Sequence, residues 1–194
     1  MDNTDYIEIG DVELLTTAGS ISAWVKIDSN ANQCVIGKYE STVGNSRQYA
    51  LNINTSKNPQ WNVQASASSY ASGTTATSST VLSIGTWYHL CGTFSTSQAG
   101  KLYINGVLDK TAVSAIANAI DDTSETLKIG NSGDVRYFDG NICQVGIWDA
   151  VLTQAQIQSV MEKTYDELTA SEKTDLVSYW PLDVDATDSH GSND

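Results

Sequence analysis

Two clusters of oxygen-bearing side chains near the ends of the chain have the composition of metal-binding loops. Calcium prefers hard oxygen ligands and takes about six to eight of them, often from turns rich in Asp, Asn and Gly. The candidate ligands in "MDNTD" and "DATDSHGSND" are Asp2, Asn3, Asp5, Asp185, Asp188, Asn193 and Asp194. Solvated acids that form turns are the alternative interpretation, and the composition of the clusters is compatible with both.

The acidic residues lack the spacing that glycoside hydrolysis requires. An acid and a nucleophile about 5 Å apart must point the same way, and a strand achieves this at positions i and i+2 or i+4. Glu162, Asp166 and Glu167 lie in a helical region with the wrong spacing. Asp183 and Asp185 have the i, i+2 spacing, but they stand among turn residues. We therefore expect no catalytic residues and no enzymatic activity.

The overall composition limits the partners of this protein. The chain has 194 residues and a net charge of −13, which repels phosphate backbones, so nucleic-acid binding is not expected. No apolar run reaches the length of about 18 residues that a membrane span needs. No secretory signal is visible at the N-terminus, although a signal can be removed and lysis can also release a protein. We expect the protein outside the cell or on a virion surface.

The cysteines and histidines do not suggest chemistry of their own. Cys34, Cys91 and Cys143 are widely spaced without a CxxC motif, which argues against zinc or redox sites. A disulfide between two of them is possible, but we expect three small buried hydrophobes. His89 is predicted to be structural, because no partners for a catalytic triad stand nearby.

Strands are the elements that must position these groups. In "SISAWVKID" every second residue from Ile21 to Ile27 is apolar, so one face of a strand meets a core and Trp24 lies on the other face. In "KLYINGVLDK" the pair Asn105-Gly106 predicts a two-residue hairpin turn. Residues 65–80 are small and low in complexity, which is typical of an edge strand or a loop, or of a hydroxyl-rich rim beside a ligand site.

A helical region follows the strands. "LTQAQIQSVMEK" has apolar residues at helical spacing, and Thr153 with Gln156 forms a capping-box pattern. A second such pattern, Thr169 with Glu172, predicts a short helix in "TASEKTDL". Residues 152–175 are therefore predicted to be helical, and "LVSYWPLD" is predicted to be a last strand. The fold class predicted is all-β: a two-sheet antiparallel sandwich with two short C-terminal helices and a final closing strand.

Five segments resemble, in the same order, the laminin-G-like jelly rolls of the concanavalin A-like lectin/glucanase superfamily, which includes pentraxin-like domains. They are "DYIEIGD", "SISAWVKID", "GTWYHLCGTFSTSQAGKLYINGVLD", "LKIGNSG" and "YFDGNICQVGIWDAVLTQAQI". The motif "WYHL…G…KLYING" is the most specific part of the resemblance. The resemblance implies one jelly-roll domain over residues 1–194, with one concave sheet and loops along its rim.

The resemblance also raises the question of residues 176–194. Related domains often have a strand like "LVSYWPLD" before the "DYVEI" strand, whereas here it follows the helical region. Either the segment begins a truncated second domain, or the order is circularly permuted and the segment closes the sandwich. Because the termini of such domains often lie close together, we favour closure. We predict that Val177–Leu182 pairs next to the strand at Asp5–Ile9, which would bring the two oxygen-bearing clusters together.

The resemblance further implies a calcium site beside a strand that often carries an acid. Here that strand reads "GNICQVGIW", with Cys143 and Gln144 in place of the acid. Asp139 stands close by and is a further candidate ligand.

Carbohydrate binding is the most frequent non-enzymatic role that the resemblance implies. Sugars stack their C–H faces on aromatic rings, and their hydroxyls bond to polar side chains. Strand parity or loop position favours Trp24, Trp61, Tyr70 and Tyr137 as stacking residues, with half-buried packing as the alternative for each. Trp87, Trp148 and Trp180 are instead predicted to lie in the core.

The sequence thus predicts a non-catalytic, calcium-associated module that binds glycans, as an adhesion domain, at a cell or virion surface. One alternative is a structural or assembly protein, such as a phage capsid decoration, a fibre or a tandem-repeat domain, which contacts copies of itself or other virion proteins. The other alternative is a glycoside hydrolase or lyase.

Overall fold

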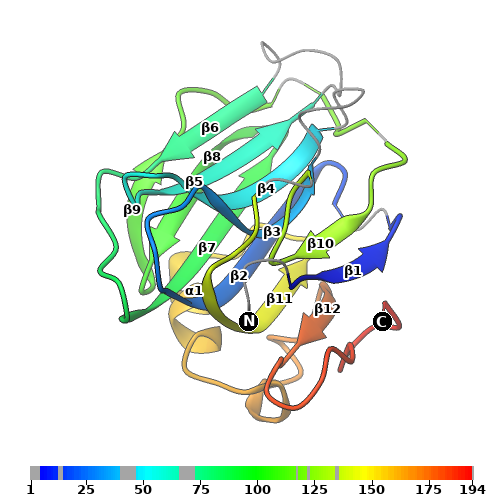
Figure 1. Ribbon diagram of the computed structural model, residues 1–194. Helices are drawn as coiled ribbons and strands as arrows, with labels where there is room; N and C mark the ends of the chain where they lie inside the picture. The colour runs from blue at the N-terminus through cyan, green and yellow to red at the C-terminus, as the bar shows by residue number, and fades with distance from the viewer. Residues whose placement is uncertain are drawn as a thin grey trace.

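The computed structural model describes residues 5–12, 15–39, 47–65, 73–116, 118–121, 123–133 and 136–193. Over these residues, twelve strands form two antiparallel sheets of six strands each, and the sheets stack face to face (Figure 1). The predicted all-β jelly-roll sandwich is therefore confirmed.

The first sheet has the spatial order β1-β10-β3-β4-β5-β6. Its strands are β1 (Ile7–Gly10), β3 (Gln33–Tyr39), β4 (Arg47–Ile53), β5 (Pro59–Gln64), β6 (Gly73–Thr77) and β10 (Leu127–Ile129). The threonine-rich β6 is an edge strand, as predicted for part of residues 65–80.

The second sheet has the order β12-β11-β2-β7-β8-β9. Its strands are β2 (Ala18–Ile27), β7 (Trp87–Ser95), β8 (Gln98–Ile104), β9 (Val107–Thr111), β11 (Gly140–Trp148) and β12 (Leu176–Trp180). Asn105 and Gly106 connect β8 to β9 with φ angles of 50° and 71°. These positive angles confirm the predicted hairpin turn.

An inner core fills the space between the two sheets. Successive side chains of a strand point to opposite faces, so β2 contributes Ile21, Ala23, Val25 and Ile27 to this core. Trp61 of β5 is fully buried in it, and a Cβ on Gly92 of β7 would stand 2.3 Å from the Trp61 ring. The glycine therefore provides the space that the indole occupies.

An outer core covers the opposite face of the second sheet. The covering elements are α1 (Gln154–Val160) and the 3-10 turn η2 (Tyr165–Glu167), and Figure 1 shows α1 against this sheet. The buried residues of this outer core are Cys91, Tyr103, Trp148, Leu152, Ile157, Val160, Leu168, Leu176 and Tyr179. The C-terminal region therefore adds a third layer to the two-sheet sandwich, on the outer face of the second sheet.

The helical predictions for residues 152–175 are partly wrong. Helix α1 begins after Thr153, whose side chain forms the predicted capping box with Gln156. The second predicted helix, at "TASEKTDL", is a turn, although Thr169 donates to the Glu172 carboxylate as its capping box requires. The chain leaves this turn through Asp175, whose φ of 61° cannot continue a right-handed helix.

Strand β12 is part of the sandwich, but its predicted neighbour is wrong. It pairs with β11 at the edge of the second sheet, whereas β1 pairs with β10 in the first sheet. Trp180 extends from β12 into the inner core and is fully buried. Burial of such a side chain stabilises a fold by about 1.5–3 kcal/mol, so residues 176–180 are integral to the folded structure.

The cysteine prediction is confirmed for two of the three residues. All three thiols are free; Cys34 and Cys91 are buried, and Cys143 is half-buried. Neither helix in the described ranges is long and apolar enough to cross a membrane.

Candidate functional site

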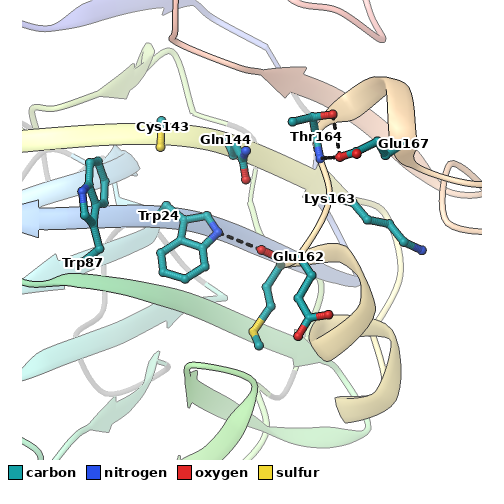
Figure 2. Close-up of a pocket in the computed structure, with 9 residues that line it drawn as sticks. Trp24, Trp87, Cys143, Gln144, Glu162, Lys163, Thr164 and Glu167 are labelled. Atoms are coloured by element: carbon teal, nitrogen blue, oxygen red, sulfur yellow. Dashed lines mark hydrogen bonds between the residues drawn. The ribbon is translucent and has the colours of Figure 1, made fainter.

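A pocket of about 340 Å³ opens where the end of α1 meets the outer face of the second sheet (Figure 2). We call it the tryptophan pocket. Its lining residues are Trp24, Trp87, Cys143, Gln144, Met161, Glu162, Lys163, Thr164 and Glu167. Ligand sites of proteins usually have volumes of about 300–1,000 Å³, so the pocket is large enough for a small ligand.

Two tryptophans on neighbouring strands form one side of this pocket. Trp24 projects from β2 on the face opposite the inner core, and its indole N–H donates to the Met161 carbonyl at 2.9 Å. Trp87 begins β7 and is 41% exposed. The Lys26 ammonium lies 5.5 Å from the centre of the Trp87 ring. The pocket therefore presents one fixed indole and one accessible indole.

The indole of Trp87 also differs from the other four in its hydrogen bonding. The N–H groups of Trp24, Trp61, Trp148 and Trp180 each donate to a backbone carbonyl, at 2.9–3.0 Å. The Trp87 N–H has no such acceptor among the residues that the structure describes. It is therefore available to a ligand.

A β-bulge in β11 brings two adjacent side chains to the pocket. The pairing of β11 with β2 shifts between Cys143 and Gly146, and Gln144 has a φ of 51°. Ile142 and Val145 both enter the inner core, so the two residues between them line the outer face. The Gln144 N–H donates to the Pro181 carbonyl at 2.9 Å, which ties the bulge to the segment after β12.

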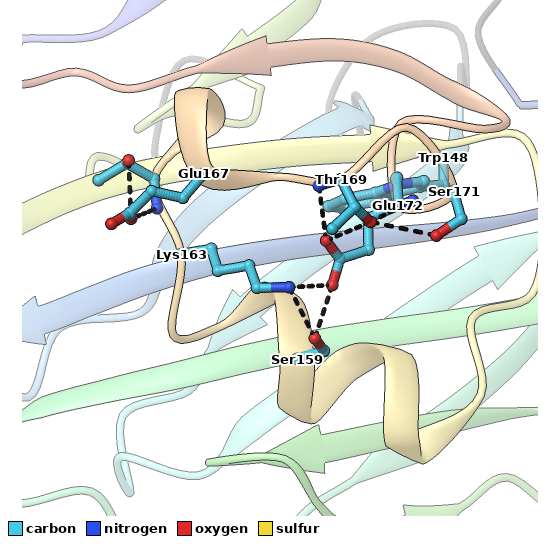
Figure 3. Close-up of polar contacts among 8 residues, drawn as sticks. Trp148, Ser159, Lys163, Glu167, Thr169, Ser171 and Glu172 are labelled. Atoms are coloured by element: carbon cyan, nitrogen blue, oxygen red, sulfur yellow. Dashed lines mark hydrogen bonds and ion pairs between the residues drawn. The ribbon is translucent and has the colours of Figure 1, made fainter.

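The wall opposite the tryptophans is the turn that follows α1. Glu172 fixes this turn, because its carboxylate accepts from Lys163, Ser159 and Thr169 (Figure 3). Burial alone would raise the pKa of Glu172, but these hydrogen bonds outweigh it and lower the pKa to about 2. The carboxylate therefore stays charged and holds Lys163 in an ion pair.

The remaining titratable groups favour binding over chemistry. Hydrogen bonds from the Thr164 backbone N–H and hydroxyl lower the pKa of Glu167, so this rim residue is an anion and a hydrogen-bond acceptor. Burial raises the pKa of the Cys143 thiol and Asp183 adds to the effect, so the thiol stays protonated. Burial lowers the pKa of His89, which packs edge-on against Trp24, to about 4.

A second depression of about 200 Å³ adjoins the tryptophan pocket. The two share Cys143, Gln144 and Thr164. The adjoining depression adds Tyr165, Asp166, Tyr179, Pro181, Asp183 and Ser189. The two depressions therefore meet at the β11 bulge, which supplies Cys143 and Gln144 to both.

The four residues predicted to stack on sugars do not share one site. Trp24 lies off the inner core, as predicted, and lines the tryptophan pocket. The prediction for Trp61 is wrong, because its side chain fills the inner core and donates to the Thr93 carbonyl. Tyr137 is half-buried, with its ring 6.1 Å from that of Tyr6. Tyr70 lies outside the described residues.

Three other tryptophans were expected in the core. Trp148 and Trp180 are buried as predicted, but Trp87 is exposed because it stands at the first position of β7. Its alternation with His89 and Cys91 indicates the outer face, and this is the sequence signal that identifies it. Nothing in the sequence shows that α1 ends beside it.

The predicted calcium ligands are not gathered in the described parts of the chain. No group of three or more His, Cys, Asp or Glu residues there is placed to hold a metal ion. Asp5 and Asp185 are exposed, and Asp139 is half-buried with its backbone joined to Gln33 and Asp28. Asp2, Asn3 and Asp194 lie outside the described residues.

Asp188 has a structural role in the C-terminal loop. Its Oδ1 accepts from the backbone N–H groups of Tyr179, His190 and Gly191 at 2.9–3.0 Å, and its Oδ2 accepts from Asn193. Burial alone would raise the pKa of Asp188, but these hydrogen bonds outweigh burial and lower the pKa. The carboxylate therefore organises the C-terminal loop against β12. Calcium binding stays a prediction.

Comparison with known proteins identifies the family of this fold. The family model of the concanavalin A-like lectin/glucanases superfamily matches residues 1–158. The chain therefore belongs to this superfamily, as the sequence resemblance indicated.

More specific similarities are partial. Pentraxin-related protein PTX3 of Mus musculus is 33% identical over 91 residues, which is 41% of this chain and 24% of that protein. A putative carbohydrate binding protein from Bacteroides ovatus has a similar fold, with a TM-score of 0.68 and 17% identity over 90% of this chain and 50% of that one. Domain 4 of AbnA, an extracellular arabinanase from Geobacillus stearothermophilus solved with arabinotriose, gives a TM-score of 0.61 and 16% identity over 82% of this chain and 73% of that one.

Proposed function

We propose that this protein is a non-catalytic carbohydrate-binding module and that the tryptophan pocket is its binding site. The observation that carries the proposal is the exposed Trp87 indole, which lies beside Trp24 and close to polar groups. An indole face packs against the C–H face of a sugar ring, while polar groups nearby bond to its hydroxyls.

The polar groups around the two indoles suit a neutral sugar. Glu162 and Glu167 offer carboxylate acceptors, and Gln144 offers both a donor and an acceptor. The Trp87 N–H adds a donor without a described partner. Lys163 is paired with Glu172 and does not neutralise the acidic rim. A neutral glycan meets these groups without charge repulsion.

The family relationship supports the same function. Two proteins of similar fold are described as a putative carbohydrate binding protein and as a domain in complex with arabinotriose. The protonated Cys143 thiol and the neutral His89 supply no activated nucleophile or general acid, which favours binding without catalysis. Calcium association, adhesion and a place on a cell or virion surface remain part of the proposal.

A glycan array tests the proposal directly. The wild-type protein is applied with calcium and with chelator, beside Trp87→Ala and Tyr6→Ala. Tyr6 is a matched control, because it is also 41% exposed but belongs to the first sheet region. We expect neutral glycans to bind the wild type and Tyr6→Ala, with about tenfold weaker binding by Trp87→Ala. Absence of any neutral ligand, or equal binding by both variants, would overturn the proposal; the chelator arm tests calcium separately.

A further inference from the structure

A second pocket, of about 230 Å³, lies on the outer face of the first sheet and has a different chemistry. We call it the amide pocket. Its lining residues are Asn32, Tyr39, Asn52, Asn54, Thr55, Gln60, Asn62, Thr75 and Arg136. No carboxylate is among these described residues, although the whole chain has a net charge of −13.

Cross-strand register arranges the amides of this pocket. Leu51, Trp61 and Ala76 point into the inner core, so the residues that alternate with them face outward. Asn52 of β4 pairs with Gln60 of β5, and Asn62 of β5 pairs with Thr75 of β6. Three neighbouring strands of one sheet therefore hold the polar groups (Figure 1), which makes the arrangement rigid.

The internal hydrogen bonds leave specific atoms available. The Thr75 hydroxyl donates to Asn62 Oδ1 at 2.9 Å, and Gln60 Nε2 donates to the Thr77 hydroxyl at 3.1 Å. Asn62 Nδ2 remains as a donor and Gln60 Oε1 as an acceptor. A sugar hydroxyl both donates and accepts, so this alternation of groups is complementary to a saccharide.

Asn52 is the strongest indication that the pocket receives a ligand. The residue is 1% exposed, and its Oδ1 is buried without a hydrogen-bond partner among the described residues. A buried polar group without a partner destabilises a folded protein. A ligand hydroxyl that donates to this oxygen would remove that penalty.

Arg136 supplies the only positive charge in the described lining. Its guanidinium lies 5.6 Å from the centre of the Tyr39 ring, and it forms no ion pair with a described acid. Tyr39 itself is 5% exposed, so it holds the guanidinium and does not offer a stacking face. Guanidinium groups bind carboxylates through two parallel hydrogen bonds.

We propose that the amide pocket is a second binding site, for an acidic saccharide whose carboxylate meets Arg136 and whose hydroxyls meet Asn52, Gln60 and Asn62. The site goes beyond the neutral-glycan function proposed for the tryptophan pocket and does not depend on it. The two sites lie on the outer faces of different sheets, and they differ in ligand charge: neutral at the tryptophan pocket and negative at the amide pocket.

Titration with uronic-acid oligosaccharides tests the second site. The probes are oligomers of galacturonate, glucuronate and mannuronate, each compared with its carboxyl methyl ester by calorimetry. We expect at least one free acid to bind about tenfold more tightly than its ester, because the ester removes a charge-assisted hydrogen bond. Arg136→Gln should abolish this preference, whereas Trp87→Ala should leave it unchanged.

Asn52→Leu separates a binding role from a structural one. Leucine has a similar size and removes the buried amide, so we expect the melting temperature to be retained or raised while binding of both acid and ester is lost. The proposal is overturned if no free acid binds more tightly than its ester, or if the preference survives in Arg136→Gln. It is equally overturned if Asn52→Leu lowers the melting temperature and leaves binding intact.

Discussion

The tryptophan pocket and the amide pocket lie on opposite faces of the sandwich and are built in different ways. Register within one sheet arranges the amides on β4 and β5 and the Thr75 hydroxyl on β6. The tryptophan pocket instead needs a wall from residues 161–167, outside the sheet, and this wall depends on Lys163 and Glu172. The amide pocket is therefore as stable as its sheet, whereas the tryptophan pocket can be lost while the sheets stay folded. The following predictions test this difference, from the largest expected effect to the smallest.

Trp180→Ala should have the largest effect, because this side chain joins the C-terminal region to the inner core. We expect the free energy of unfolding to fall by about 3–5 kcal/mol, as for other buried tryptophans. Chemical denaturation measures it. Val184→Ala, at a position 89% exposed, is the control and should change stability by less than about 0.5 kcal/mol. Equal effects of the two substitutions would show that β12 is dispensable. The same interpretation predicts that deletion of residues 176–194 unfolds the protein.

Acid should destabilise the protein through His89, which packs against Trp24 of the tryptophan pocket. The pKa of His89 is lowered from 6.5 to about 4 by burial. The unfolded chain therefore binds a proton first as the pH falls, and stability is lost between pH 6.5 and about 4. The loss should be about 2–3 kcal/mol by linkage.

Urea denaturation between pH 8 and pH 4 measures this loss. His89→Leu should make the free energy of unfolding nearly independent of pH over this interval. His190→Leu serves as the control, because His190 is only half-buried. An unchanged slope in His89→Leu would rule out this histidine as the cause.

Glu172→Gln should weaken the tryptophan pocket selectively, because it removes the charge that fixes Lys163. We expect a loss of about 1–2 kcal/mol in stability, as for other charge-assisted hydrogen bonds. The depressed pKa means that the wild type has this stability above pH 4.5 and loses it as the pH falls toward 2.

Binding data for the same variant sharpen the comparison of the pockets. Neutral-glycan binding should decrease in Glu172→Gln, while the preference for acidic saccharides should be kept. Glu8→Gln provides a control charge change, since this exposed carboxylate of β1 lines neither pocket and has no described ion pair. A parallel decrease at both sites would contradict their independence.

Gln144→Gly should have the smallest effect on stability. Glycine adopts the φ of 51° without strain, but it also gives the unfolded chain more freedom, so we expect a change within about 1 kcal/mol. Neutral-glycan binding should still fall, because the amide is lost. Thermal unfolding beside a binding titration distinguishes the two effects, and full affinity in Gln144→Gly would exclude a role in the pocket.

Local patterns predicted much of the fold and less of the sites. The alternation in β2, the Asn105-Gly106 turn and the Thr153 capping box each depend on a few consecutive residues, and each is confirmed. The partner of β12 depends instead on contacts between distant segments, which one-dimensional patterns do not specify. The misplaced Trp61 had an available signal, because Gln60, Asn62 and Gln64 alternate with it and mark the outward face.

The central claim is that a glycan contacts Trp87 in the tryptophan pocket. Nuclear magnetic resonance of the five tryptophan indole N–H groups tests it most directly, during titration with a neutral glycan that binds in the array. The account predicts a large shift of the Trp87 signal and a smaller one for Trp24. The signals of Trp61, Trp148 and Trp180, which donate to backbone carbonyls away from the pocket, should stay in place. A saturating titration that leaves the Trp87 signal unmoved would contradict the account.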